Sequence, residues 1–223
     1  MNYQVIIPAR GGSKRFPKKN IHLLNGVPLI AHSILFALKT FDKTNIWVNT
    51  DDEEIALISK KYGVNITIRP IDLGSDIAST ADVLYFQNIF FNANNIPCDA
   101  MILLQATNPI RPQNLIYSAI SEFEKSNRNS LASFSTLNRK FGKINNFFFT
   151  PTNYKPGQRM QHIEPDYFEN GLIYITNIAS IQQKEIITSD VFPLLIDSEE
   201  SLVDIDEPKD MLFAEFLLKN ITI

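Results

Sequence analysis

Five cationic side chains are concentrated in one short segment near the N-terminus. The sequence VIIPARGGSKRFPKKN passes from an apolar run into a loop at residues 9–20, and the cations of that loop are Arg10, Lys14, Arg15, Lys18 and Lys19. Gly11 and Gly12 let backbone N–H groups come close to a ligand, and lysine supplies compact positive charge for phosphate oxygens. The loop is therefore predicted to hold the phosphates of a nucleotide. The alternative is a solvated turn whose lysines only add solubility.

A pair of carboxylates lies near the C-terminus, in the run Val203-Asp-Ile-Asp. Asp204 and Asp206 are two residues apart in an extended apolar stretch, so their side chains share one face. Two such carboxylates can hold Mg²⁺ against a phosphate. For Asp206 the alternative is helix capping, because Glu207, Pro208 and a predicted helix follow it. Asp204 has no such alternative and is the stronger candidate.

Further polar side chains follow a buried strand. Gln105, Thr107 and Asn108 are either turn formers or hydrogen-bonding partners of a polyhydroxylated sugar. Arg111 and Arg159 could each pair with a substrate carboxylate or with a neighbouring acid. The histidines show no spacing typical of metal ligands, and none is predicted to be catalytic: His22, His32 and His162.

These residues must be positioned by a chain in which apolar β-branched segments alternate with segments of helical period. Strands are predicted at 4–8, 45–50, 64–68 and 100–105, and helices at 28–38, 53–62, 79–93 and 208–219. This order indicates a single α/β domain over residues 1–223, with a doubly wound, mainly parallel sheet in three layers. Its ligand crevice lies at the carboxyl ends of the strands, where loop 9–20 and residues 105–111 and 203–206 should meet.

The alternation fails between residues 136 and 168, where the sequence is polar, aromatic and contains proline. We interpret this segment as an insertion of short antiparallel strands that packs against a second subunit, which predicts a homodimer. The run Phe147, Phe148 and Phe149 is then interface or core rather than a stacking platform. The core resumes at Gly171.

Composition excludes several classes of protein. The 223 residues carry a net charge of −3, which disfavours a nucleic-acid or membrane-surface binder, and no apolar run approaches the length of a membrane helix. Cys98 is the single cysteine and no signal-peptide pattern begins the sequence, so a cytoplasmic location is expected. Neither Gly-x-Gly-x-x-Gly nor the P-loop pattern occurs in the basic loop, which disfavours a dehydrogenase or P-loop enzyme.

Six separated blocks resemble, in the same order, the N-acylneuraminate (CMP-sialic acid) cytidylyltransferase family. They begin at Ala9, Arg69, Ser75, Leu103, Asn170 and Asp204. The resemblance spans nearly the whole chain and implies a Rossmann-like nucleotidyltransferase fold, CTP and a sialic-acid-like nonulosonic acid as substrates, and Mg²⁺ as cofactor. The segment 136–165 matches only loosely, around Gln158 and Arg159; there we expect sugar contacts and the subunit interface.

The resemblance also implies a role for individual residues. Catalysis is assigned to Lys19, Asp204 and Arg10. Nucleotide binding is assigned to Arg10, Gly11, Gly12, Ser13, Lys14, Lys19, Asn20, Arg69 and Ser79. Sugar binding is assigned to Gln105, Thr107, Asn108, Arg159, Asn170 and Tyr174, and metal binding to Asp204 and Asp206.

In the predicted reaction the anomeric hydroxyl of the sugar acid attacks the α-phosphorus of CTP and expels pyrophosphate, with catalysis mostly by positioning and charge neutralisation. The proton acceptor is either a metal-bound water or a carboxylate assisted by the metal. Two alternatives remain. One is a cytidylyltransferase for another keto sugar acid such as Kdo, and the other is a non-catalytic nucleotide-binding protein.

Overall fold

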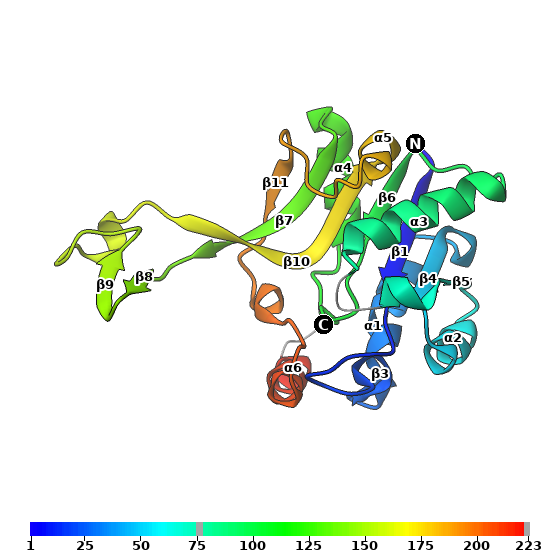
Figure 1. Ribbon diagram of the computed structural model, residues 1–223, viewed down its shortest axis with the longest axis horizontal. Helices are drawn as coiled ribbons and strands as arrows, with labels where there is room; N and C mark the ends of the chain where they lie inside the picture. Colours follow the sequence, from blue (N-terminus) through cyan, green and yellow to red (C-terminus); the bar gives the residue numbers. More distant parts are fainter. Residues whose placement is uncertain (75–77, 221–223) are drawn as a thin grey trace.

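A seven-stranded sheet forms the centre of the computed structural model, which describes residues 1–74 and 78–220. Its strand order is β11-β7-β10-β6-β1-β4-β5 (Figure 1). The bounds are β1 Tyr3–Pro8, β4 Ile46–Thr50, β5 Asn65–Ile68, β6 Ala100–Leu103, β7 Ser130–Leu137, β10 Asp166–Asn177 and β11 Phe192–Leu195. Strands β6, β1, β4 and β5 are parallel, as are β7 and β11, and β10 runs antiparallel to both of its neighbours. The predicted α/β fold with a mainly parallel sheet is confirmed.

Helices cover both faces of this sheet, as the doubly wound prediction requires. They are α1 Leu29–Leu38, α2 Glu53–Lys60, α3 Thr80–Ala93, α4 Leu115–Ser126, α5 Ile178–Gln182 and α6 Pro208–Asn220. The buried side chains of α1, α2 and α4 share one apolar core with the sheet, and those of α3 and α5 share a second core on the other face. A third, smaller core joins α6 to the segment after β1 and to Val203 and Ile205. The last helix is thereby fixed beside the basic loop.

The second half of the sheet departs from the prediction. Helix α4 and strands β7 and β11 were not predicted, and β10 begins at Asp166, before the predicted restart at Gly171. For β10 the reason is its pairing with β7, which shifts register between Glu169 and Tyr174. Gly171 has φ +76° within this irregularity. Such a bulge breaks the period-two pattern, so the strand is hard to recognise from sequence.

An arm projects from the core between β7 and β10 (Figure 1). We use this name for residues 138–165, which include an antiparallel hairpin of β8 Gly142–Asn145 and β9 Phe148–Pro151. The two residues that connect the strands, Asn146 and Phe147, both have positive φ. Ile144, Phe147, Phe148 and Phe149 are exposed. The arm thus carries apolar side chains that the other described residues of this chain do not cover.

Two minor strands, β2 Leu23–Leu24 and β3 Val27–Pro28, form a separate hairpin before α1. Short 3-10 helices lie at Lys19–Ile21, Lys43–Asn45, Ile71–Gly74, Met160–His162 and Glu199–Leu202. No helix among residues 1–74 and 78–220 is long and apolar enough to cross a membrane.

Candidate active site

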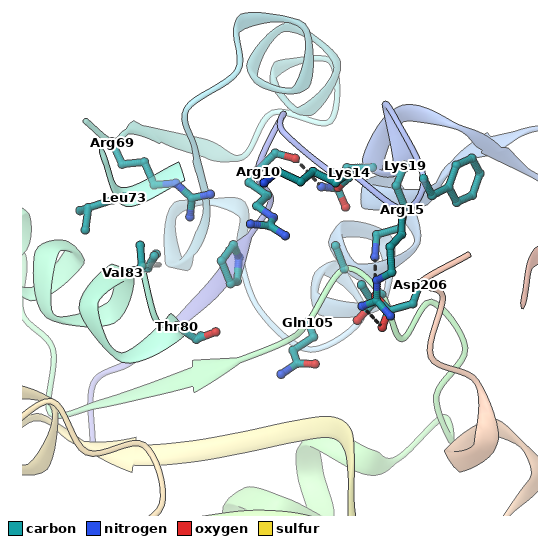
Figure 2. Close-up of a pocket in the computed structure, with 17 residues that line it drawn as sticks. Arg10, Lys14, Arg15, Lys19, Arg69, Leu73, Thr80, Val83, Gln105 and Asp206 are labelled. Atoms are coloured by element: carbon teal, nitrogen blue, oxygen red, sulfur yellow. Dashed lines mark hydrogen bonds and ion pairs between the residues drawn. The ribbon is translucent and has the colours of Figure 1, made fainter. Parts of the chain in front are cut away.

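A cavity of about 370 Å³ opens at the carboxyl ends of β1, β5 and β6 (Figure 2). Because these strands are parallel, the segments that follow them converge at one edge of the sheet. The cavity is lined by Pro8, Arg10, Ser13, Lys14, Arg15, Phe16, Lys19, Asn20, Arg69, Leu73, Ala78, Thr80, Val83, Gln105, Ala106, Thr107 and Asp206. The basic loop, the end of β6 and the 203–206 stretch therefore meet as predicted.

The basic loop is fixed by its own hydrogen bonds. The Asn20 side-chain amide donates to the carbonyl oxygen of Arg10 at 2.9 Å, and the Ser13 amide donates to the carbonyl of Gly11 at 3.1 Å. These contacts hold the loop as a cradle in which Arg10 and Lys14 line the cavity. Lys18 instead pairs with Glu54 on the surface at 2.8 Å. Four of the five cations of the loop therefore line the cavity, and the fifth, Lys18, lies on the surface.

The two glycines of the loop have different structural roles. A Cβ on Gly11 would lie 2.4 Å from Oδ2 of Asp52, whereas a Cβ on Gly12 meets no atom within 4 Å. Asp52 is the N-cap of α2, where its Oδ1 accepts from the Ile55 amide at 2.9 Å. Gly11 is therefore required for close packing against this cap. Gly12 is exposed, and neither glycine is among the residues that line the cavity.

We expect Gly11→Ala to destabilise the fold by about 1–2 kcal/mol, because the methyl group displaces the carboxylate that caps α2. Gly12→Ala, the matched control, should unfold at a urea concentration close to that of the wild type. Urea unfolding followed by circular dichroism measures both. Equal stability of the two variants would contradict this account of Gly11.

Lys19 is the most enclosed cation of the loop, with 8% of its surface exposed. Its Nζ donates to the carbonyl oxygen of Ile205 at 2.6 Å and to Oδ1 of Asp206 at 3.0 Å. Arg15 binds the other carboxylate oxygen of Asp206 at 2.6 Å (Figure 2). Loss of water raises the pKa of Asp206, but the bonds and charges of Lys19 and Arg15 together hold it below its ordinary value. Asp206 is thus ionised and ties the loop to the C-terminal segment.

The capping alternative for Asp206 is wrong, because α6 begins at Pro208 and so follows Glu207. The carboxylate of Asp210 instead accepts from the backbone amides of Asp206 and Glu207, at 2.9 and 2.7 Å. This leaves the Asp206 side chain turned toward the cations rather than toward the helix amides.

Asp204 lies beside the end of β6. The Ile205 amide donates to the carbonyl of Thr107 at 2.8 Å, which joins the two segments. Desolvation raises the pKa of the Asp204 carboxyl above its ordinary value, a hydrogen bond from Thr107 opposes this, and the charge of Asp206 adds to it. The two carboxylates are therefore close enough to influence each other. Among residues 1–74 and 78–220, no group of three or more His, Cys, Asp or Glu is placed to hold a metal ion.

Arg69 follows β5 and is buried at the cavity wall. One terminal nitrogen donates to Oδ1 of Asp51 at 3.0 Å and the other to Oδ1 of Asn49 at 3.4 Å, while its Nε has no acceptor among residues 1–74 and 78–220. Burial lowers its pKa, and Asp51 counteracts this. A buried donor without a partner is costly, and a ligand that fills the cavity could satisfy it.

Ser79 caps helix α3 in a capping box, accepting from the Asp82 amide at 3.1 Å. Ala78 and Thr80 on either side of it line the cavity, and Ser79 itself does not. The resemblance block that begins at Ser75 falls in part on 75–77, outside the described residues. Ser79 as a nucleotide ligand stays a prediction.

The predicted sugar-binding residues divide into two groups. Gln105 and Thr107 line the cavity, whereas Asn108, Asn170 and Tyr174 are buried. Asn108 donates to the carbonyls of Asn170 and Val203, at 3.1 and 2.8 Å. These bonds clamp the end of β6 to β10 and to the 203–206 stretch.

The other two buried residues are also engaged within the fold. Oδ1 of Asn170 accepts from the Ser133 hydroxyl and its amide donates to Ser135, at 2.6 and 2.9 Å. The Tyr174 hydroxyl donates to Glu169 at 3.3 Å. Arg159 lies on the arm, which contributes no residue to the cavity lining of its own chain.

Several cavity residues were not singled out from the sequence. Arg15 was noted only as one of five cations, and Phe16, Leu73, Thr80 and Val83 were not considered. These residue types do not indicate a ligand site, because apolar residues and helix-starting residues also occur away from such sites. The position of Arg15 within the loop was the one available signal.

The comparisons with known proteins agree with this geometry. A family model described as Cytidylyltransferase matches residues 4–191. The chain belongs to the cytidylyltransferase family. It is therefore a nucleotidyltransferase, as the resemblance implied.

Individual members of this cytidylyltransferase family match over most of the chain. The CMP-N,N'-diacetyllegionaminic acid synthase of Legionella pneumophila is 33% identical, over 98% of this chain and 97% of its own length. The N-acylneuraminate cytidylyltransferase of Streptococcus agalactiae is 31% identical over 93% of this chain, which spans only 51% of that longer relative. The solved CMP:2-keto-3-deoxy-manno-octonic acid synthetase with CTP has a TM-score of 0.71 over 98% of this chain and 99% of its own, at 16% identity, and shows the fold alone.

Proposed function

We propose that this cytidylyltransferase transfers CMP from CTP to the anomeric hydroxyl of a sialic-acid-like nonulosonic acid. The observation that carries the proposal is the cavity itself, in which four cations of loop 9–20 face polar side chains from the end of β6. The family of the chain supplies the reaction class. Relatives named for legionaminic and acylneuraminic acids support the acceptor class.

The cationic loop suits a nucleoside triphosphate. Arg10 and Lys14 reach the cavity from a backbone that Asn20 holds in place, so their charge is preorganised before phosphate binds. Arg69 lies at the far wall, where its Nε, which has no acceptor in the described part of the chain, could donate to an acceptor on the nucleotide. The triphosphate would thus lie over Gly11 and Gly12, with the nucleoside toward Arg69.

The transfer is an in-line displacement at phosphorus. The oxygen of the sugar hydroxyl forms a bond to the α-phosphorus, the bond from that phosphorus to the bridging oxygen breaks, pyrophosphate leaves and the hydroxyl proton is released. Lys19, enclosed beside Asp206, would neutralise charge on the phosphates as the transition state forms. Catalysis therefore consists mainly of positioning and charge neutralisation.

The carboxylates near the cavity fit Mg²⁺. This ion is commonly held by one or two carboxylates together with substrate phosphates, so Asp204 and Asp206 form a sufficient protein set. Asp206 already shares its oxygens with Lys19 and Arg15, which leaves Asp204 as the better ligand. When bound, the ion would add positive charge beside the phosphates.

The acceptor sugar would lie against Gln105 and Thr107, whose side chains border the cavity next to the phosphate loop. Arg159 cannot take part from its own arm if that arm stays extended from the core (Figure 1). A second copy of the chain would bring it near, so we propose a homodimer in which the arm completes the sugar site of the partner. We also place the enzyme in the cytoplasm, where CTP is available.

The dimer gives a prediction of its own. Ile144, Phe147, Phe148 and Phe149 of the arm are exposed apolar side chains that a partner chain should bury. We expect sedimentation velocity at micromolar concentration to show a dimer, and Phe148→Glu to shift it toward monomer. A wild-type protein that sediments as a monomer would contradict the proposal.

An acceptor panel tests the sugar assignment. Sialic, legionaminic and pseudaminic acids and Kdo are each supplied with CTP and Mg²⁺, and pyrophosphate release is followed. We expect a nonulosonic acid to be used at least tenfold more efficiently than Kdo. Kdo as the best acceptor would replace this function with the Kdo-activating alternative, and no release with any acid would favour a non-catalytic binder.

A further inference from the structure

A second cavity, of about 520 Å³, lies apart from the catalytic one and has no residue in common with it. It is bordered by α1, the segment after β6, and residues near and within α6. Its lining residues are His32, Leu35, Phe36, Lys39, Pro109, Ile110, Arg111, Pro112, Gln113, Glu200 and Leu218. Most of this wall is apolar, and neither the family nor the proposed reaction assigns it a role.

Arg111 is the unusual group in this wall. Only 7% of the residue is exposed, and its guanidinium donates to three neutral acceptors. These are the carbonyl of Leu172 at 2.8 Å, the hydroxyl of Ser33 at 3.0 Å and the carbonyl of Gln105 at 2.7 Å. Among the described residues no carboxylate pairs with it, and burial lowers its pKa to about 9. A buried charge without a counter-ion is costly unless something neutralises it.

The other charged side chains of the second cavity do not neutralise the positive charge of Arg111. Lys39 is exposed and cationic, Glu200 is anionic, and burial lowers the pKa of His32 so that its ring is neutral at pH 7. The wall therefore carries a net charge of about +1. Arg111 has five N–H donors, of which three are used in the bonds above. The ring of Phe36 lies 5.5 Å below the guanidinium and extends the apolar floor.

We propose that this second cavity binds a small monocarboxylic acid with an apolar body. The carboxylate would pair with Arg111 and the apolar part would pack against the wall of Leu35, Phe36 and Ile110. A phosphate dianion suits the site less well, because one excess positive charge in a mostly apolar wall does not offset the loss of water from two negative charges.

Arg111 also connects the two cavities. Arg111 borders the second cavity, and its guanidinium donates to the backbone carbonyl of Gln105, a residue that borders the catalytic cavity. A carboxylate bound to Arg111 would alter the hydrogen bond that holds the backbone of Gln105. The ligand is therefore an effector of the sugar site. This consequence rests on the proposed function, whereas the binding itself does not.

Calorimetric titration with phenylacetate tests the binding, with phenylacetamide as its neutral isostere. We expect phenylacetate to bind the wild-type protein at least tenfold more tightly than phenylacetamide. Leu35→Trp, which fills the cavity from its exposed rim, should weaken phenylacetate binding at least tenfold. Leu57→Trp, a matched change at an exposed position of α2 outside the cavity, should leave binding unchanged. Equal binding of acid and amide, or unaltered binding to Leu35→Trp, would overturn the proposal.

Kinetics test the effector role separately. At saturating phenylacetate we expect the KM for the sugar acid to change at least twofold in the wild-type enzyme and to stay constant in Leu35→Trp. A constant KM in a wild-type enzyme that binds phenylacetate would overturn the effector role. The calorimetric titration contains neither CTP nor sugar. Its result therefore remains valid even if the proposed function is wrong.

Discussion

Lys19→Ala should lower the turnover number by roughly two to three orders of magnitude, the scale expected when one preorganised donor to a developing charge is removed. The reason is the position of its Nζ, which lies enclosed at the cavity between the Ile205 carbonyl and Asp206. Pyrophosphate release at saturating substrates measures the effect, and circular dichroism checks that the variant is folded.

Lys18→Ala is the matched control, since it removes the neighbouring lysine of the same loop. Lys18 is exposed and paired with Glu54, and it does not border the cavity. We expect its turnover to stay within about threefold of the wild type, in line with the small contribution of exposed ion pairs. Equal losses in the two variants would return loop 9–20 to the interpretation as a solvated turn.

Asp204→Asn should abolish most activity, with a loss of about a hundredfold or more, because the amide keeps the size of the side chain but loses the charge that Mg²⁺ needs. Titration of activity with Mg²⁺ provides the measurement. A variant that regains normal turnover at high Mg²⁺ has lost only affinity for the ion, which would still support the assignment. Near-normal turnover at every Mg²⁺ concentration would contradict it.

Asp206→Asn separates the possible role of Asp206 in binding Mg²⁺ from its role in stabilising the fold. Its carboxylate holds Lys19 and Arg15 and does not cap α6, so we expect a loss of activity together with a small loss of stability. An Asp206→Asn protein that is stable and turns over normally would leave the metal to Asp204 and a partner elsewhere.

The first half of the sheet was predictable because its signals are local. Strand β6 is a continuous apolar run, β1 and β4 each contain three consecutive apolar residues, and β5 alternates polar and apolar residues; each strand is followed by a polar segment. Parallel pairing then brings those segments together without further information. Helix α4 had a readable signal that the prediction did not use, since Leu115, Ile116, Ala119 and Phe123 recur at helical spacing and are buried.

The roles of the buried asparagines could not be predicted in the same way. The amide of Asn108 finds its two acceptors 62 and 95 residues further along the chain, so residue type alone does not separate a sugar ligand from a structural clamp. The same holds for Arg111, which was expected to pair with a substrate carboxylate or a neighbouring acid and whose partners within the described chain are three neutral acceptors. Burial and long-range partners, rather than residue type, decide these cases.

The requirement for CTP tests the central claim most directly. Pyrophosphate release is measured with CTP, ATP, GTP and UTP in turn, at fixed Mg²⁺ and with the best sugar acid of the acceptor panel. We predict release with CTP and at least a hundredfold less with each of the other three nucleotides. Comparable turnover with ATP or GTP would contradict the assignment of this chain as a CMP-transferring enzyme.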